Sequence, residues 1–210
     1  MKKIIVLVFG SLIIASGYCM EQKVELVEIK KWDPSILIEM PYATKNNFTK
    51  KEVYPASLKC MLAKEPAQAL VLVQKYLQAK ALGLKVWDAY RPKSCQINLW
   101  NICADTYPDE KERSQYVSNP YTEGGRHTRG YSVDVTLVDK NGKELHMPTG
   151  FDDFSPQAWS ECAEVDPIAK QNRAILIEAM SKHGFKVIKC EWWHFDYQGW
   201  QDQPILDVLT

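Results

Sequence analysis

Residues 132–142, with the sequence SVDVTLVDKNG, decide the fold class. From 132 to 139 apolar and polar side chains alternate and β-branched residues are frequent, which is typical of a β-strand with one buried face. Asn141-Gly142 comes shortly after and favours a tight hairpin turn, because both central residues of that turn need positive φ. We therefore predict a strand over 132–139, a turn at Asn141-Gly142 and a returning strand over 143–147.

The segment before this hairpin predicts a helix and then a strand. A helix over 66–82 can begin near Pro66, which suits a first turn, and can end at Gly83. Its apolar residues recur at helical spacing and comprise Leu70, Val71, Val73, Leu77 and Ala81. Residues 84–89 have the composition of a strand that follows this helix.

Further helices and strands are predicted on both sides of the hairpin. Pro92 opens a helix that runs to about residue 104, and Asp166-Pro167 caps a third helix that ends at Gly184. The inward residues of the third helix are Ile168, Ile175, Leu176, Ala179 and Met180. Residues 185–190 and 192–197 are predicted strands. Helices mixed with hairpins favour an α+β fold, a single domain with a central antiparallel sheet flanked by helices.

Composition and the N-terminus indicate an exported globular protein. Of 210 residues, 46% are hydrophobic and 25% charged, and 26 basic side chains balance 26 acidic ones. This composition excludes a disordered chain, and it offers no basic excess for binding nucleic acid. Lys2 and Lys3 precede an apolar run over 4–15, which is the layout of a secretory signal. We predict a signal peptide over 1–19, one domain over 20–210, and a periplasmic or secreted protein without a transmembrane anchor after cleavage.

The cysteines leave the redox pattern open. A lipid on Cys19 is the alternative to simple cleavage, but Tyr18 stands where lipoprotein signals carry a small residue. The remaining five are Cys60, Cys95, Cys103, Cys162 and Cys190. Export permits disulfides, but an odd number leaves at least one cysteine free or paired outside the chain. Cys95 and Cys103 lie eight residues apart on one predicted helix, about 12 Å, which is too far for a disulfide.

The four histidines separate into two structural ones and two of chemical interest. His183 lies at the end of the third predicted helix, and His146 has no acidic partner at ligand spacing, so we expect structural roles for both. His127 precedes Asp134 by seven residues, a separation that neither a straight strand nor one helix can bring onto one metal ion. The chain must reverse between them, and Gly130 can take the backbone angles that a reversal needs.

The second group is Glu191-Trp192-Trp193-His194. A spacing of three places Glu191 and His194 on opposite faces of a regular strand, so the strand must bend or end there if both serve one site. A carboxylate near a metal but not on it is what a general base for an attacking water requires, whereas the two tryptophans are expected to pack. Buried, hydrogen-bonded polar residues are the alternative interpretation of each pair. Together the pairs favour a site for one zinc ion with two histidines, one aspartate and an open position.

Four segments resemble a known family. GGRHTRGYSVDVTL at 124–137 and EWWHFD at 191–196 resemble the paired motifs of the VanX-type D-alanyl-D-alanine dipeptidases and of the related zinc D,D-carboxypeptidases. WDAYRP at 87–92 and GFDDFSP at 150–156 match further family segments, the latter typical of the dipeptidases. The chain departs from the first family motif at two positions, where Gly125 replaces Ser and Ser132 replaces Ala. In the family that Ser lies near the amino end of the substrate.

The resemblance implies a set of roles. One zinc ion per chain would be held by His127, Asp134 and His194, with Glu191 as the catalytic base. Arg91 would stabilise the oxyanion, and a structural ion pair between Arg91 and an acid such as Asp88 is the alternative.

The expected function is that of an exported zinc dipeptidase that hydrolyses D-Ala-D-Ala during cell-wall peptide turnover or remodelling. Its partners would be a small D,D-dipeptide and peptidoglycan fragments. One alternative is a D,D-carboxypeptidase that removes the terminal D-Ala from stem peptides. The other is a metal-stabilised peptidoglycan-binding module without activity. Glu191 argues against this alternative, because a module that only binds needs no base.

Overall fold

A largely antiparallel sheet of five strands forms the centre of the part that the computed structural model describes, residues 24–209. In spatial order the strands are β2 (Leu37–Ile38), β4 (Leu82–Asp88), β5 (Ser132–Asp139), β7 (His194–Tyr197) and β6 (Phe185–Val187). Only β2 and β4 pair in parallel within this sheet. The fold is thus the predicted α+β class. The predicted signal over 1–19 lies outside the described residues.

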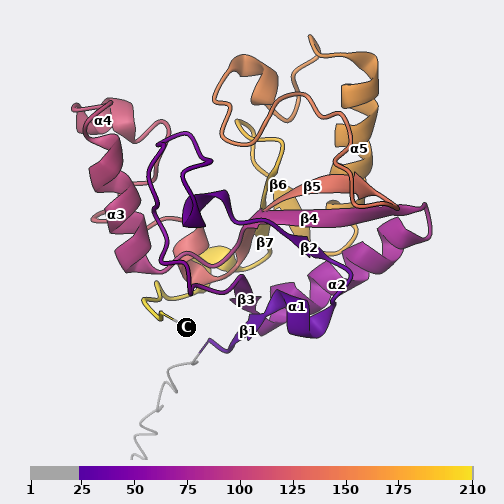
Figure 1. The fold of residues 1–210 in the computed structure, drawn as a ribbon, viewed down its shortest axis with the longest axis horizontal. Helices are drawn as coiled ribbons and strands as arrows, with labels where there is room; N and C mark the ends of the chain where they lie inside the picture. Colours follow the sequence, from indigo (N-terminus) through magenta and orange to yellow (C-terminus); the bar gives the residue numbers. More distant parts are fainter. Residues whose placement is uncertain (1–23, 210) are drawn as a thin grey trace, which may run out of the picture.

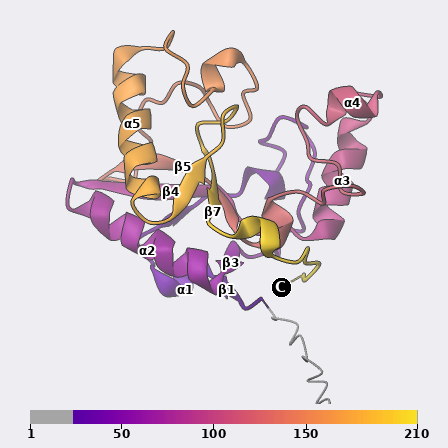
Figure 2. The same cartoon turned by 180° about the vertical axis from the view of Figure 1, so that it is seen from behind.

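Helices lie at both ends of the sheet. They are α1 (Ile29–Trp32), α2 (Lys64–Gln78), α3 (Lys93–Cys103), α4 (Glu110–Arg113) and α5 (Pro167–Ser181). Figures 1 and 2 show α3 and α4 at one end of the molecule and α2 and α5 at the other. A small antiparallel pair, β1 (Leu26–Glu28) with β3 (Met61–Ala63), lies beside α1 and α2. Single 3-10 turns occupy Pro41–Ala43, His127–Arg129, Pro156–Ala158 and Trp200–Asp202.

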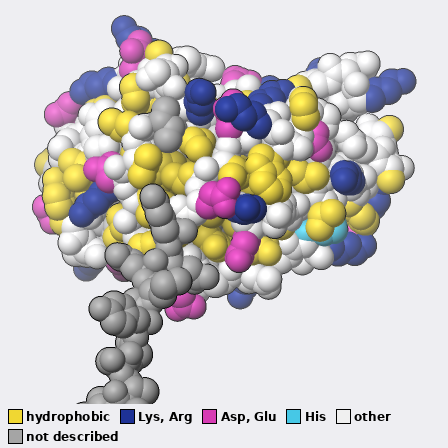
Figure 3. Space-filling view, turned by 90° about the horizontal axis from the view of Figure 1, so that it is seen from below, with side chains coloured by type: hydrophobic (Ala, Val, Ile, Leu, Met, Phe, Trp, Pro, Cys, Tyr) yellow, Lys and Arg dark blue, Asp and Glu magenta, His cyan; other side chains and the backbone are white. Residues whose placement is uncertain are grey.

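The core consists of two apolar clusters. The larger contains residues of β4 and β5 together with the inner faces of α2 and α5, and the smaller surrounds α3. Phe151 packs against both clusters, with its ring centroid 5.0 Å from that of Trp87 and 5.8 Å from that of Tyr42. The face seen from below carries charges of both signs among apolar side chains (Figure 3). None of the helices within residues 24–209 has the length and hydropathy that crossing a bilayer requires.

The first predicted helix is present, but its end was misplaced. Helix α2 ends at Gln78, and Ala81, with φ 57°, takes the left-handed position that was predicted for a glycine. Gly83 lies inside β4 instead. A glycine is suited to this position because the Gln74 side chain packs closely against it: a Cβ on Gly83 would stand 3.3 Å from Nε2 of Gln74. Oε1 of the same Gln74 accepts a hydrogen bond from the Leu84 amide.

A turn forms at Asn141-Gly142, but only Gly142 has positive φ, so it is a longer turn over 139–143 than the predicted one, and the returning strand is absent. Gly142 has φ 81°, and the Asp139 amide donates to the Lys143 carbonyl at 2.8 Å. The carboxylate of Asp139 also accepts from the amides of Asn141 and Lys143, which closes the turn tightly. Beyond it only an isolated bridge between Val138 and Glu144 forms.

The C-terminal elements follow the prediction with shorter strands. Asp166 caps α5 by accepting from the amides of Ile168 and Ala169, as predicted. Ile168 does not face inward, since it is 61% exposed and Ala169 is the buried residue of that turn. The predicted strands over 185–190 and 192–197 shorten to β6 and β7, and the irregular segment between them carries Glu191.

Candidate metal centre and active site

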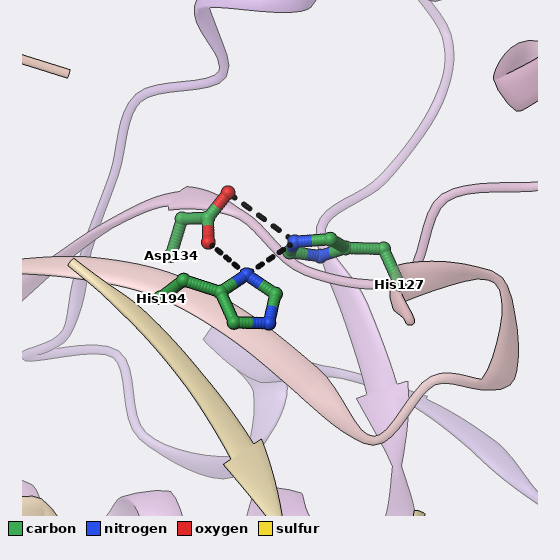
Figure 4. Close-up of side chains that lie close together, drawn as sticks. All are labelled: His127, Asp134 and His194. Atoms are coloured by element: carbon green, nitrogen blue, oxygen red, sulfur yellow. Dashed lines mark hydrogen bonds and ion pairs between the residues drawn. The ribbon is translucent and has the colours of Figure 1, made fainter. Parts of the chain in front are cut away.

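Three side chains converge at one end of the central strands. His127 begins a 3-10 turn, Asp134 lies on β5 and His194 is the first residue of β7. Asp134 and His194 are direct partners in the antiparallel register. One ligand atom from each of the three residues lies within 4.8 Å of the others (Figure 4). The structure therefore brings together the residues that the sequence proposed as metal ligands.

Gly130 makes this convergence possible. It reverses the chain between His127 and Asp134 with φ 70°, a conformation that L side chains rarely adopt. A Cβ at this position would stand 2.9 Å from Cδ2 of Leu26 and 3.3 Å from the backbone nitrogen of Ala63. The reversal predicted from spacing is thus present at the predicted residue.

Hydrogen bonds orient the two imidazole rings. Nδ1 of His127 lies 2.7 Å from the Ala89 carbonyl, to which it donates, so Nε2 is left as an acceptor. Nε2 of His194 lies 3.0 Å from Oδ1 of Asp196, to which it donates, so Nδ1 is the ring nitrogen available to a metal ion. These two acceptor nitrogens are 3.1 Å apart, and Nδ1 of His194 is 2.9 Å from Oδ1 of Asp134. Two lone pairs and a carboxylate that face one point fit a divalent cation of the zinc type.

The electrostatics of the centre also favour a positive charge. Burial alone would raise the pKa of Asp134, but His127 and His194 outweigh it and hold the pKa well below its usual range. Burial opposes charge on His194, yet its hydrogen bonds to Asp134 and Asp196 raise its pKa to about 10. Without a cation a proton on Nδ1 therefore bridges His194 and Asp134, and a metal ion would replace that proton and take the Nδ1 lone pair. All three proposed ligands are buried, so water screens these interactions poorly.

Glu191 lies beside this centre without joining it. Its Oε2 is 3.9 Å from Nδ1 of His194, and burial raises the pKa of its carboxyl. β7 begins at His194 and does not extend back to Glu191. This agrees with the prediction that the strand must bend or end there if both residues serve one site. Trp192 and Trp193 are fully buried and pack on their neighbours, as expected.

Arg91 enters the same cavity from the end of β4. Its Nε donates to the Tyr54 hydroxyl at 2.8 Å, one terminal nitrogen donates to Asp88 at 2.5 Å and the other donates to Gln96 at 2.8 Å. The ion pair with Asp88 is therefore present, and Arg91 lines the cavity as well. A guanidinium has five N–H donors, so one on each terminal nitrogen remains for a further partner. Sequence reasoning missed Tyr54 and Gln96.

A cavity of about 190 Å³ joins these groups. Its lining includes Tyr42, Arg91, Tyr116, His127, Asp134, Asp152, Phe154, Glu191 and His194. Asp152, with φ 58°, has one buried carboxylate oxygen without a hydrogen-bond partner among the described residues. Burial, and secondarily the charge of Asp134, raise the pKa of Asp152 well above its usual value. Sequence reasoning did not single out Asp152, although the GFDDFSP segment contains it.

Gly125 lies against Gln96. It has φ 83°, and a Cβ there would stand 3.2 Å from Oε1 of Gln96. The Gln96 side chain thus lies against the position where the family pattern has Ser. The two remaining histidines do not line the cavity: His146 lies 3.5 Å from Asp166 on the surface, and His183 packs on Tyr76.

Comparison with known proteins identifies the family of this chain. The profile of the D-ala-D-ala dipeptidase family, Peptidase_M15, matches residues 22–209. D-alanyl-D-alanine dipeptidase of Escherichia coli is 35% identical over 187 residues, which cover 89% of this chain and 92% of that protein. The dipeptidase of Enterococcus faecalis is 30% identical, over 81% of this chain and 87% of that protein.

Solved structures of peptidoglycan peptidases are also similar. The LdcB LD-carboxypeptidase superposes with a TM-score of 0.47 at 19% identity, covering 68% of this chain and 64% of that one. The D,D-dipeptidase VanXYg gives a TM-score of 0.44 at 17% identity, covering 83% of this chain and 67% of that one. Because the family profile spans nearly the whole sequence and the relatives share 30–35% of their residues, this chain belongs to the D-Ala-D-Ala dipeptidase family and is a metallopeptidase hydrolase.

Proposed function

We propose that this protein hydrolyses D-alanyl-D-alanine with one zinc ion held by His127, Asp134 and His194. The observation that carries the proposal is the convergence of three ligand atoms within 4.8 Å, in a cavity that also contains Glu191 and Arg91. When bound, zinc would act as a Lewis acid that polarises the peptide carbonyl and acidifies the attacking water.

Glu191 acts as the general base in this proposal. Its Oε2 lies 3.9 Å from Nδ1 of His194, so the carboxylate stands beside the proposed metal position without being one of the ligands. From there it can reach a water bound to the metal. Burial raises its pKa, which makes it a stronger base than an exposed glutamate. It accepts the proton of the water and then delivers it to the amine that leaves.

Arg91 stabilises the carbonyl oxygen as negative charge develops on it. The guanidinium is already oriented by Tyr54, Asp88 and Gln96, so little reorganisation accompanies the reaction. A donor of this kind is typically worth about 10²–10³ in rate.

Asp152 favours a dipeptide over a longer peptide. It lines the cavity of about 190 Å³ together with the proposed metal ligands. Burial disfavours the charged form of Asp152 in the free protein, and the ammonium group of a dipeptide would restore that charge by pairing with the unpartnered oxygen. A stem peptide has a neutral amide at that place and would leave the carboxylate without a partner. Glu191 in turn favours an enzyme over a binding module.

The place of action rests on the sequence alone. The signal-like layout of residues 1–19 leads us to propose a periplasmic or secreted enzyme that acts on peptides from the cell wall. Fractionation that finds the full-length protein in the cytosol would contradict this part of the proposal.

Metal analysis combined with an assay of D-Ala release tests the reaction. We expect about one zinc per chain, loss of D-Ala-D-Ala hydrolysis after chelation, and recovery on adding zinc. Glu191→Gln should keep its zinc and lose turnover, while Glu164→Gln, at an exposed position outside the cavity, should behave as wild type. Hydrolysis that survives chelation, or a preference for a pentapeptide over the free dipeptide, would overturn the proposal.

A further inference from the structure

Asp196 lies directly behind one of the proposed metal ligands. It follows His194 by two residues on β7, so both side chains lie on the same face of the strand. Its Oδ1 is 3.0 Å from Nε2 of His194, on the opposite side of the ring from the metal centre. The same register that pairs Asp134 with His194 pairs Ser132 with Asp196.

Two further donors hold the Asp196 carboxylate. The Ser132 hydroxyl donates to its Oδ1 at 2.7 Å, and a terminal nitrogen of Arg126 donates to its Oδ2. The Arg126 guanidinium itself stacks on the Trp200 ring, 4.5 Å from the centroid. Because Asp196 is only 6% exposed, its charge needs these partners.

From this geometry we infer that Asp196 is the positioning residue of the metal centre, with Ser132 and Arg126 as its supports. By accepting the proton on Nε2, Asp196 fixes the tautomer in which Nδ1 of His194 carries the lone pair that faces Asp134 and His127. It also fixes the rotation of the ring and increases the basicity of Nδ1. The inference rests on the proposed function, because it assigns these residues to the zinc site.

Ser132 has a specific part in this arrangement. It is a departure from the family pattern, which has Ala at this position. In this chain its hydroxyl, fully buried, supplies a hydrogen bond to the carboxylate that holds His194. The departure therefore strengthens the support of the metal ligand instead of being a neutral change.

The test is zinc affinity, measured by competition with a chromogenic chelator on the whole protein. Removal of a partner of this kind typically weakens metal binding by about 10–100-fold, and we expect that loss for Asp196→Asn, with turnover largely regained in excess zinc. Ser132→Ala removes one hydrogen bond and should weaken zinc binding by about two- to tenfold. Asp202→Asn, on the exposed turn that follows β7, is the matched control and should bind as wild type.

The outcomes separate the inference from the proposed function. Wild-type zinc affinity in Asp196→Asn would overturn the inference while leaving zinc-dependent hydrolysis intact. Should Asp196→Asn fail to fold, Ser132→Ala decides, and unchanged zinc affinity in that variant would overturn the inference. A wild-type protein that binds no zinc would instead contradict the proposed function.

Discussion

Arg91 has two roles: it binds three neighbouring side chains, and it keeps free N–H donors for the substrate. Its guanidinium satisfies Tyr54, Asp88 and Gln96 and still keeps an N–H on each terminal nitrogen. The single ammonium of Arg91→Lys cannot span these partners, so we expect kcat for D-Ala-D-Ala to fall by about 10²–10³ with zinc content unchanged. Arg113→Lys changes a buried arginine that stacks on Trp100, and it should lower stability without this loss of kcat. Equal kcat in Arg91→Lys and wild type would contradict the role of Arg91.

Asp152 makes a different prediction, which concerns binding of the substrate amine. Asp152→Asn should lower kcat/KM for D-Ala-D-Ala by about 10–100-fold, because a hydrogen bond to a charged group is lost. The wild-type enzyme should discriminate strongly against N-acetyl-D-Ala-D-Ala, and the variant should discriminate less. Asp153→Asn is the matched control, since Asp153 is exposed and accepts only from the Ser155 amide. If the variant kept the wild-type discrimination, Asp152 would not be the partner of the ammonium group.

Site residues that belong to one sequence motif could be predicted, whereas site residues that come together only in the folded chain could not. His127 and Asp134 could be placed together because their spacing demanded a reversal and Gly130 allowed one. Tyr54 lies 37 residues before Arg91 and carries no motif of its own, so nothing in the sequence joins it to the site. Asp152 and Asp153 are adjacent aspartates, and nothing in the sequence tells which of them lines the cavity; in the fold it is Asp152, whose φ is 58°.

Helix α3 shows how a distant segment can complete an element. Pro92 at its N-terminus offers no side-chain cap, but the carboxylate of Asp207 accepts from the amide and hydroxyl of Ser94 at 2.9 and 2.7 Å. Asp207→Ala should therefore lower the free energy of unfolding by about 1 kcal/mol, as measured by urea denaturation. Asp202→Ala, an exposed aspartate of the same C-terminal segment, should leave the midpoint unchanged. A loss as large in Asp202→Ala would mean that the cap is not the cause.

Elements with a strong local signal were predictable, and their ends were not. Asp166 capped α5 as expected because a cap acts through its own neighbouring amides. The end of α2 instead lies at Gln78, followed by the left-handed Ala81, and the glycine that was expected to end it lies in β4, where Gln74 packs closely against it. In the same way, β6 and β7 are separated by a segment without a turn signal, in which Trp192 and Trp193 are buried in the larger cluster.

On the scale of the whole molecule, the cavity lies between the smaller apolar cluster and the ends of two central strands. Leu99 and Tyr42 of the smaller cluster line it on one side, and the ends of β5 and β7 line it on the other. Stability of the smaller cluster therefore bears on the geometry of the site. The five cysteines within residues 24–209 are free thiols in the structure, and two of them, Cys95 and Cys103, belong to this cluster.

These two thiols give the smaller cluster a predictable dependence on alkaline pH. Burial raises the pKa of Cys95 and of Cys103 to about 11, from an ordinary value of 9.0. Between pH 9 and about 11 the unfolded chain therefore releases protons that the folded chain retains, so the free energy of unfolding falls as pH rises. The stabilisation is fully present below pH 9.

Urea denaturation from pH 8 to 10 should show a steeper loss of the free energy of unfolding in wild type than in the double variant Cys95→Ala, Cys103→Ala. Cys162→Ala, which removes a thiol outside this cluster, should keep the wild-type dependence. Equal slopes in wild type and the double variant would show that the two thiols ionise freely in the folded protein and that the smaller cluster does not exclude water from them.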